Sequence, residues 1–144
     1  MILTSIDSNE YAQVHANEQK RFIQVTWLQQ SPSEVFRQVQ TKALAHALEH
    51  ELTTWLCDMQ EMAYLEMADQ NWLVREIFTS FDPKHQHVFA YVINSAGFEL
   101  MSSFRIHDLV KHHPELHQRL RVDIFLSKDL AQQWLTAVSD VHLY

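Results

Sequence analysis

The sequence predicts an α/β fold with a single-layer mixed β-sheet, in which an N-terminal antiparallel hairpin precedes a β-α-β-α-β-α parallel part with flanking helices. Residues 1–28 contain short apolar runs separated by turn signals, with period-two alternation over residues 21–28, which indicates strands. Helical periodicity begins after Pro32, and from there apolar runs alternate with helical segments. The 144 residues fit one domain. Because no linker or repeat interrupts them, we expect residues 1–144 to form a single soluble domain.

The N-terminal segment predicts strands joined by short turns, and short connections favour antiparallel pairing. We expect strands over residues 2–6, 11–15 and 21–28, with turns at residues 7–9 and 17–18. In the third strand Ile23, Val25 and Trp27 share one face, which we expect to lie in the core.

A helix start is indicated at Ser31, Pro32 and Glu34. Ser31 is expected to cap the backbone, Pro32 to occupy the first helical position and Glu34 to complete a capping box. The helix should extend to about His50. Its apolar stripe has helical spacing and consists of Phe36, Val39, Ala43 and Ala47.

The rest of the chain predicts three strands that alternate with helices. In the first of these strands Trp55 and Leu56 fall on opposite faces, which indicates a central strand with helices on both sides. The expected elements are a strand at 53–59, a helix from about Asp69, a strand at 87–93, a helix at 98–111, a helical turn from Pro114, a strand at 122–126 and a helix capped by Ser127.

Composition excludes several classes of function. The net charge of -7 and the scattered positions of 11 Lys and Arg residues disfavour nucleic acid and anionic lipid surfaces. A single glycine leaves no Gly-rich phosphate loop. The lone Cys57 permits no intramolecular disulfide and fits a reducing compartment. With neither a signal peptide nor ~20 consecutive apolar residues to span a membrane, we expect a cytoplasmic protein.

Three segments suggest a family. They are a strand ending in Trp-Leu-Cys-Asp at 55–58, a helix with Asp-Gln-Asn-Trp at 69–72, and a terminal Ala-Gln-Gln-Trp-Leu at 131–135. Over residues 20–136 the chain resembles a bacterial STAS-like group, which is related to the anti-sigma-factor-antagonist fold and more distantly to lipid-transfer CRAL-TRIO domains. The resemblance implies a mixed sheet of four or five strands and a role in regulation or interaction rather than catalysis. No cofactor is expected.

Sigma-antagonist relatives are switched by phosphorylation of a Ser or Thr where a central strand runs into the next helix. The corresponding segment here, residues 58–66, contains neither residue type. A phosphate there would also be repelled by Asp58, Glu61 and Glu66. We therefore do not transfer the phosphorylation switch to this chain.

The segment after the central strand is the predicted binding region for a ligand or partner. Asp58 ends the strand, and it either contacts a ligand or caps the following loop. Met59, Met62 and Tyr64 either pack against the domain or form an adaptable contact surface. Trp72 completes the candidate set, although packing in the core is the default for a tryptophan on an apolar face.

Residues 46–50 have the pattern H-x-x-E-H of an inverted zinc-protease motif. On a helix His46 and His50 can both reach one zinc ion, with Glu49 beside them as a base. Because the sequence nominates no third ligand, favourable contact of histidine with the helix C-terminus is the preferred interpretation, and we expect no metal. Two further clusters, His112/His113/His117 and His85/His87, are interpreted as polar surface. Cys57 is interpreted as a buried structural thiol.

Three functions follow from these observations. The first is a non-catalytic regulatory module that binds a protein partner, or a second copy of itself, through residues 59–67. The second is a small-molecule or lipid-binding domain with a pocket between the sheet and the helices carrying Trp72 and Phe104. The third and most remote is a metal-dependent hydrolase built on His46, Glu49 and His50.

Overall fold

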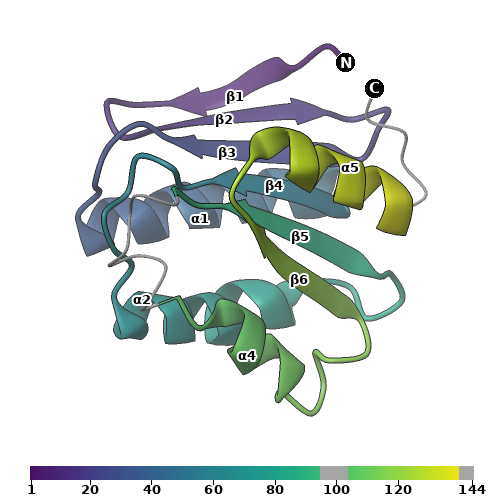
Figure 1. Cartoon of the computed structure of the whole chain (residues 1–144). Helices are drawn as coiled ribbons and strands as arrows, with labels where there is room; N and C mark the ends of the chain where they lie inside the picture. The colour runs from purple at the N-terminus through teal and green to yellow at the C-terminus, as the bar shows by residue number, and fades with distance from the viewer. Residues whose placement is uncertain (95–103, 140–144) are drawn as a thin grey trace.

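A computed structural model describes residues 1–94 and 104–139 of the chain. Its strands form one six-stranded sheet whose spatial order follows the sequence. The strands are β1 (Thr4–Ser8), β2 (Ala12–Asn17), β3 (Phe22–Trp27), β4 (Thr54–Asp58), β5 (His87–Val92) and β6 (Leu120–Phe125). Strands β1 to β3 are antiparallel and β3 to β6 are parallel, so the predicted mixed sheet is confirmed (Figure 1).

The described sheet has more strands than the four or five that the family resemblance implies. The excess arises at the N-terminus, where two short turns create a meander of three strands. In the first turn the Asn9 side chain accepts hydrogen bonds from the backbone N–H groups of Tyr11 and Ala12. Asp7 and Ser8, expected in the turn, instead extend β1 because they still pair with β2.

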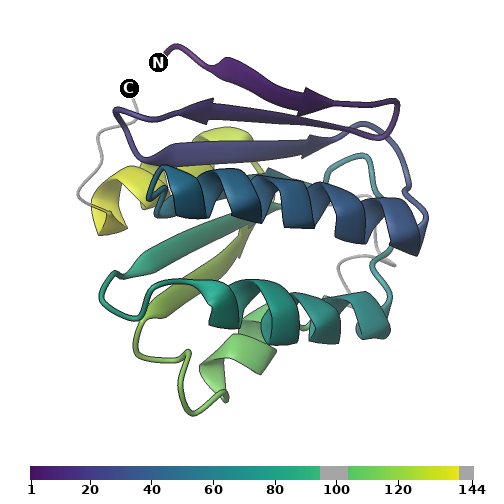
Figure 2. The same ribbon diagram turned by 180° about the vertical axis from the view of Figure 1, so that it is seen from behind.

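Helices cover both faces of the sheet. They are α1 (Ser33–Glu49), α2 (Met67–Trp72), which continues as a π-helix (Leu73–Ile77) and a 3-10 turn (Phe78–Ser80), α4 (Ile106–Lys111) and α5 (Lys128–Val138). Residues from α1, α2, the π-helix and α4 contribute to one hydrophobic cluster, while α5 packs on the opposite face (Figures 1 and 2). Each crossover from β3 to β6 thus lies on the same face of the sheet, as a uniform right-handed connection requires.

The central strand prediction is confirmed by the two hydrophobic clusters. Trp55 points into the larger cluster and Leu56 into the smaller one below α5, although the two residues are neighbours in β4. Trp55 stacks on Phe89 of β5 with ring centroids 4.8 Å apart, and Trp27 stacks on Phe36 of α1 at 5.2 Å. These two tryptophans are core residues, which excludes them from a ligand pocket.

The predicted start of the first helix is wrong, and that of the helix at 98–111 lies mostly outside the described residues. Helix α1 begins at Ser33 with Pro32 in the N-cap position, and the Ser31 hydroxyl donates to the carbonyl of Pro32 instead of capping the helix. The helix expected at 98–111 begins at Ile106 within the described residues, while 98–103 lie outside them. Arg105 precedes that helix because its N–H donates to the side chain of Gln70 at 2.6 Å, which ties the backbone to α2.

Candidate functional site

The loop that follows β4 is fixed to the domain by side-chain hydrogen bonds. The Asp58 carboxylate accepts from the backbone and side-chain N–H groups of Gln60, each at 3.1 Å, so Asp58 caps the loop. The Gln30 side-chain oxygen accepts from the N–H groups of Ala63 and Tyr64 at 2.8 and 3.1 Å. This loop is therefore held from both ends.

The predicted binding residues separate into buried and accessible ones. Met59 and Met62 lie in the hydrophobic core, where they cannot meet a partner at the surface. The Tyr64 side chain is exposed, and Trp72 is half-buried below the guanidinium of Arg37, which lies 5.4 Å from the ring centroid. Of the predicted set, Tyr64 and the partly buried Asp58 and Trp72 are the side chains that a ligand or partner can reach without rearrangement of the core.

A buried polar network positions α2 beside α1. The Asp69 carboxylate, almost fully buried, accepts from Ser33 Oγ at 2.6 Å and from Arg37 Nε at 2.8 Å. Next to it, Gln70 is fully buried and donates to the carbonyl of Leu65 at 2.9 Å. Buried polar groups are costly unless they are paired in this way, so the network defines where α2 starts.

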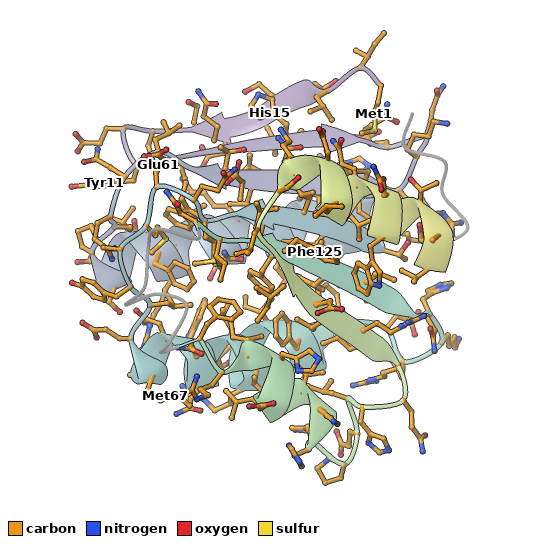
Figure 3. All side chains as sticks on the ribbon, viewed as in Figure 1. Met1, Tyr11, His15, Glu61, Met67 and Phe125 are labelled. Carbon is orange, nitrogen blue, oxygen red and sulfur yellow. The ribbon has the colours of Figure 1, made fainter. Side chains whose placement is uncertain are left out.

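An open groove of about 860 Å³ lies between the α2–π-helix segment and α4. Its apolar lining consists of Met67, Leu109, Pro114 and the nearly buried Val74, and Met67 lies on the first turn of α2, on the side away from the sheet (Figure 3). The rim is polar and consists of Asn71, Arg75, Thr79, Arg105, Asp108, His112 and His113. We call these residues the α2–α4 groove.

The π-helix forms part of one wall of the α2–α4 groove. Its five residues, Leu73–Ile77, place Val74 and Arg75 in the groove and Leu73 and Ile77 in the core. A π-helical turn is rare, and such turns occur frequently at functional sites. Sequence periodicity could not reveal it because the pattern from Trp72 to Ile77 also fits an α-helix.

A second hollow, of about 720 Å³, lies at the amino ends of β3, β4 and β5 and is lined by residues such as Lys20, Thr54 and Gln86. Its lining is more polar than that of the α2–α4 groove. In open α/β sheets, ligands bind outside the carboxyl ends of the parallel strands. The amino-end hollow is therefore the weaker candidate for a ligand site.

His46 and His50 on the last turn of α1 meet a third potential metal ligand, Glu18, from the turn between β2 and β3. Glu18 Oε1 lies 3.5 Å from His46 Nε2 and 3.5 Å from His50 Nδ1. Burial lowers the pKa of His46, as does the neighbouring His50, while Glu18 and Glu49 oppose the shift. Among the residues described, this is the one group of three such ligands that could hold a metal ion.

The sequence pattern did not indicate Glu18 as a third potential metal ligand, although the pairing of β3 with β4 places it near His46 and His50. In the parallel register Phe22 of β3 pairs with Thr54 of β4. The turn that precedes Phe22 must therefore lie beside the segment that precedes Thr54, which is the end of α1. That placement requires knowledge of which strands are neighbours, and the sequence pattern alone does not supply it.

The other histidine clusters use their ring nitrogens locally. Nδ1 of His112 lies 2.9 Å from the Asp108 carbonyl, and Nδ1 of His117 lies 2.9 Å from the His113 carbonyl. Nδ1 of His113 accepts from the N–H of Glu115 at 3.2 Å. The interpretation of His112, His113 and His117 as surface polar groups agrees with these contacts. For the His85/His87 cluster the same interpretation is wrong at His87, whose side chain is buried at the start of β5.

Cys57 is a fully buried thiol that faces Tyr91 of β5. Burial raises the pKa of Cys57 far above its usual value, Asp58 raises it further, and the hydrogen bond with Tyr91 opposes the shift only partly. Burial also raises the pKa of Tyr91. A thiol that stays protonated is a poor nucleophile, and the predicted burial of Cys57 is confirmed.

Comparison with known proteins does not extend these observations, because we found no matching family model, curated protein or solved structure. Among the residues described, no helix combines the length and apolar character needed to cross a bilayer.

Proposed function

We propose that this chain is a non-catalytic regulatory domain of the STAS-like type that binds a protein partner in the α2–α4 groove. The observation that supports the proposal is the groove itself, an open depression with an apolar floor on an otherwise acidic chain. Exposed apolar grooves with a polar rim mark protein interaction sites. The resemblance of residues 20–136 to the STAS-like group supports the same class of function.

The charges on the rim favour an apolar segment that carries acidic residues. Arg75 and Arg105 line the groove together with a single carboxylate, Asp108, and Arg75 is also ion-paired with Glu76 at 3.1 Å. A chain with a net charge of -7 repels acidic partners over most of its surface. The cationic rim, Arg105 above all, therefore makes the groove the preferred binding site for such partners. An amphipathic helix laid along the groove would match both features.

A small apolar ligand is the second candidate, since the groove volume of about 860 Å³ lies within the range of small-molecule sites. The predicted position of such a pocket, between the sheet and the helices, differs from that of the groove, which opens between helices at the surface. Small-molecule sites bury most of the ligand, and an open groove does so poorly. A protein segment is therefore favoured.

Selection from a displayed library of amphipathic helical peptides, graded in acidic content, tests the proposal. Enriched peptides are then titrated by fluorescence anisotropy against the wild type and against Met67→Glu and Leu109→Glu. Met67 is 44% exposed, so its substitution should leave the fold intact. The control is Leu130→Glu, which changes an apolar side chain of α5 that is 53% exposed.

We expect both groove variants to weaken binding at least ~10-fold, about 1.4 kcal/mol, and Leu130→Glu to leave it unchanged. Equal binding by all variants, or no enriched peptide, would refute the groove as a protein-binding site. Sedimentation measures the oligomeric state of the chain alone. If the chain forms a dimer that Met67→Glu disrupts, the occupant of the groove is a second copy of the chain rather than a different protein.

A further inference from the structure

The last turn of α1 and the β2–β3 turn are held in fixed relation by backbone hydrogen bonds. Beyond the end of α1 at Glu49, Glu51 lies in the left-handed region, φ 54°, and Leu52 N–H donates back to the carbonyl of Ala47 at 2.8 Å. Arg21, also left-handed with φ 51°, accepts at its carbonyl from the N–H groups of Thr53 and Thr54. The positions of Glu18, His46 and His50 are thus determined by the backbone on both sides.

The distances among these three side chains approach those of a metal site. Two donor atoms bound ~2.1 Å from a zinc ion at the tetrahedral angle lie ~3.4 Å apart. Glu18 Oε1 is 3.5 Å from a ring nitrogen of each histidine, and one ligand atom from each of the three residues lies within 4.8 Å of the others. Small side-chain rotations are enough to bring all three around one ion.

Nε2 of His46 gives a further indication that the site receives a ligand. This nitrogen is buried and makes no hydrogen bond to any residue that the structure describes, and its polar neighbour is Glu18 Oε1 at 3.5 Å. A buried nitrogen without a hydrogen bond costs free energy. Its direction toward Glu18, and the short distance of 4.3 Å between the two imidazole ring centroids, leave a metal ion as a natural partner.

Glu49 lies outside this group of ligands. Its Oε2 is 3.9 Å from His50 Nε2, the ring nitrogen on the side away from Glu18. Carboxylates that face the non-coordinating nitrogen of a metal-bound histidine orient the ring and raise its basicity. Glu49 therefore lies behind His50, beyond hydrogen-bond distance, and on the side away from the three ligands rather than beside the ion as the H-x-x-E-H pattern suggests.

We propose that Glu18, His46 and His50 bind one divalent transition-metal ion, zinc in the first instance, which clasps the β2–β3 turn to the end of α1. Two imidazoles and one carboxylate suit zinc and its neighbours, whereas magnesium and calcium require oxygen ligands. Water completes the coordination, because the Glu18 side chain is 54% exposed and the site opens to solvent. This metal clasp is independent of partner binding in the α2–α4 groove.

The test uses full-length chain purified without a histidine tag and treated with a chelator. Zinc is titrated by calorimetry, with magnesium as the comparison ion, and thermal unfolding is followed at each zinc concentration. Glu18→Ala and His46→Ala remove single ligands. Glu18 lies on an exposed turn, so its variant keeps the fold even if His46→Ala does not. The control is His117→Ala, which changes an exposed histidine that also has a second histidine four residues away.

We expect one zinc ion per chain and no response to magnesium. At zinc about 100-fold above Kd, the Tm should rise by roughly 5 to 10 °C. Glu18→Ala should weaken zinc binding at least ~10-fold, the effect of losing one of three ligands, while His117→Ala binds as the wild type does. Absence of zinc binding would overturn the proposal, as would unchanged affinity in Glu18→Ala, since the two histidines alone would then explain the binding.

Discussion

His87, the first residue of β5, should make the stability of the fold depend on pH. The side chain is 5% exposed, and its ring stacks on Phe81 with the centroids 4.3 Å apart. Burial lowers the pKa of His87 from 6.5 to about 4. The His85 carbonyl, 3.2 Å from Nδ1, opposes the shift, while the charges of His85 and Arg119 add to it.

The direction of the effect follows from proton binding. Between about pH 6.5 and 4 the unfolded chain binds a proton at His87 and the folded chain does not. The free energy of unfolding therefore falls as the pH decreases through this window, and the loss is complete near pH 4. A shift from 6.5 to about 4, at about 1.4 kcal/mol per pH unit, corresponds to roughly 3 kcal/mol. That is a large fraction of the stability of a small domain.

Urea unfolding at several pH values between about 7.5 and 4 measures this loss. His87→Leu removes the titrating group from an apolar site, so its stability should fall less over the window, by up to about 3 kcal/mol, than that of the wild type. His117→Leu, at an exposed position, should follow the wild type. Parallel curves for wild type and His87→Leu would show that His87 titrates normally and that its burial has no such cost.

Two further predictions concern the backbone and the buried network. Glu51→Gly should raise the free energy of unfolding by about 0.5–1 kcal/mol, because glycine adopts the left-handed conformation of Glu51 without steric cost. Urea unfolding measures this gain. Glu51→Ala, which retains Cβ, is the control and should show no gain. Asp69→Ala should lower the free energy of unfolding by about 2–3 kcal/mol, because the buried partner of Ser33 and Arg37 is lost. Asp108→Ala, at an exposed carboxylate, is the control for that loss, and a change below ~0.5 kcal/mol in Asp69→Ala would contradict the structural role of the network.

The fold could be predicted from the sequence to the extent that it depends on local pattern. The strand containing Trp55 and Leu56 was recognisable from its two-sided apolar character, and both residues are buried as expected. Ser127 is the clearest local success, because its side chain accepts from Leu130 N–H and caps α5. The cap expected at Ser31 is not formed, because the Ser31 hydroxyl donates to the Pro32 carbonyl. The next serine, Ser33, donates its hydroxyl to Asp69, a residue distant in the sequence.

The candidate sites depended more on distant contacts. Met59 and Met62 could be selected as an apolar pair, but only packing shows that they belong to the core. The α2–α4 groove is formed by two segments about 30 residues apart, together with a π-helix that the sequence pattern does not distinguish from an α-helix.

The sequence by itself determined the α/β class, the antiparallel start and parallel continuation of the sheet, and the pair of histidines one helical turn apart. Each of these follows from interactions between residues close in the chain, where side-chain periodicity and turn chemistry decide. The tertiary structure decided that Glu18 faces His46 and His50, and that α2 and α4 leave an apolar groove between them. Such contacts arise from the order in which parallel strands pair and from the packing of the crossovers that join them, so they become visible only when the whole sheet is assembled.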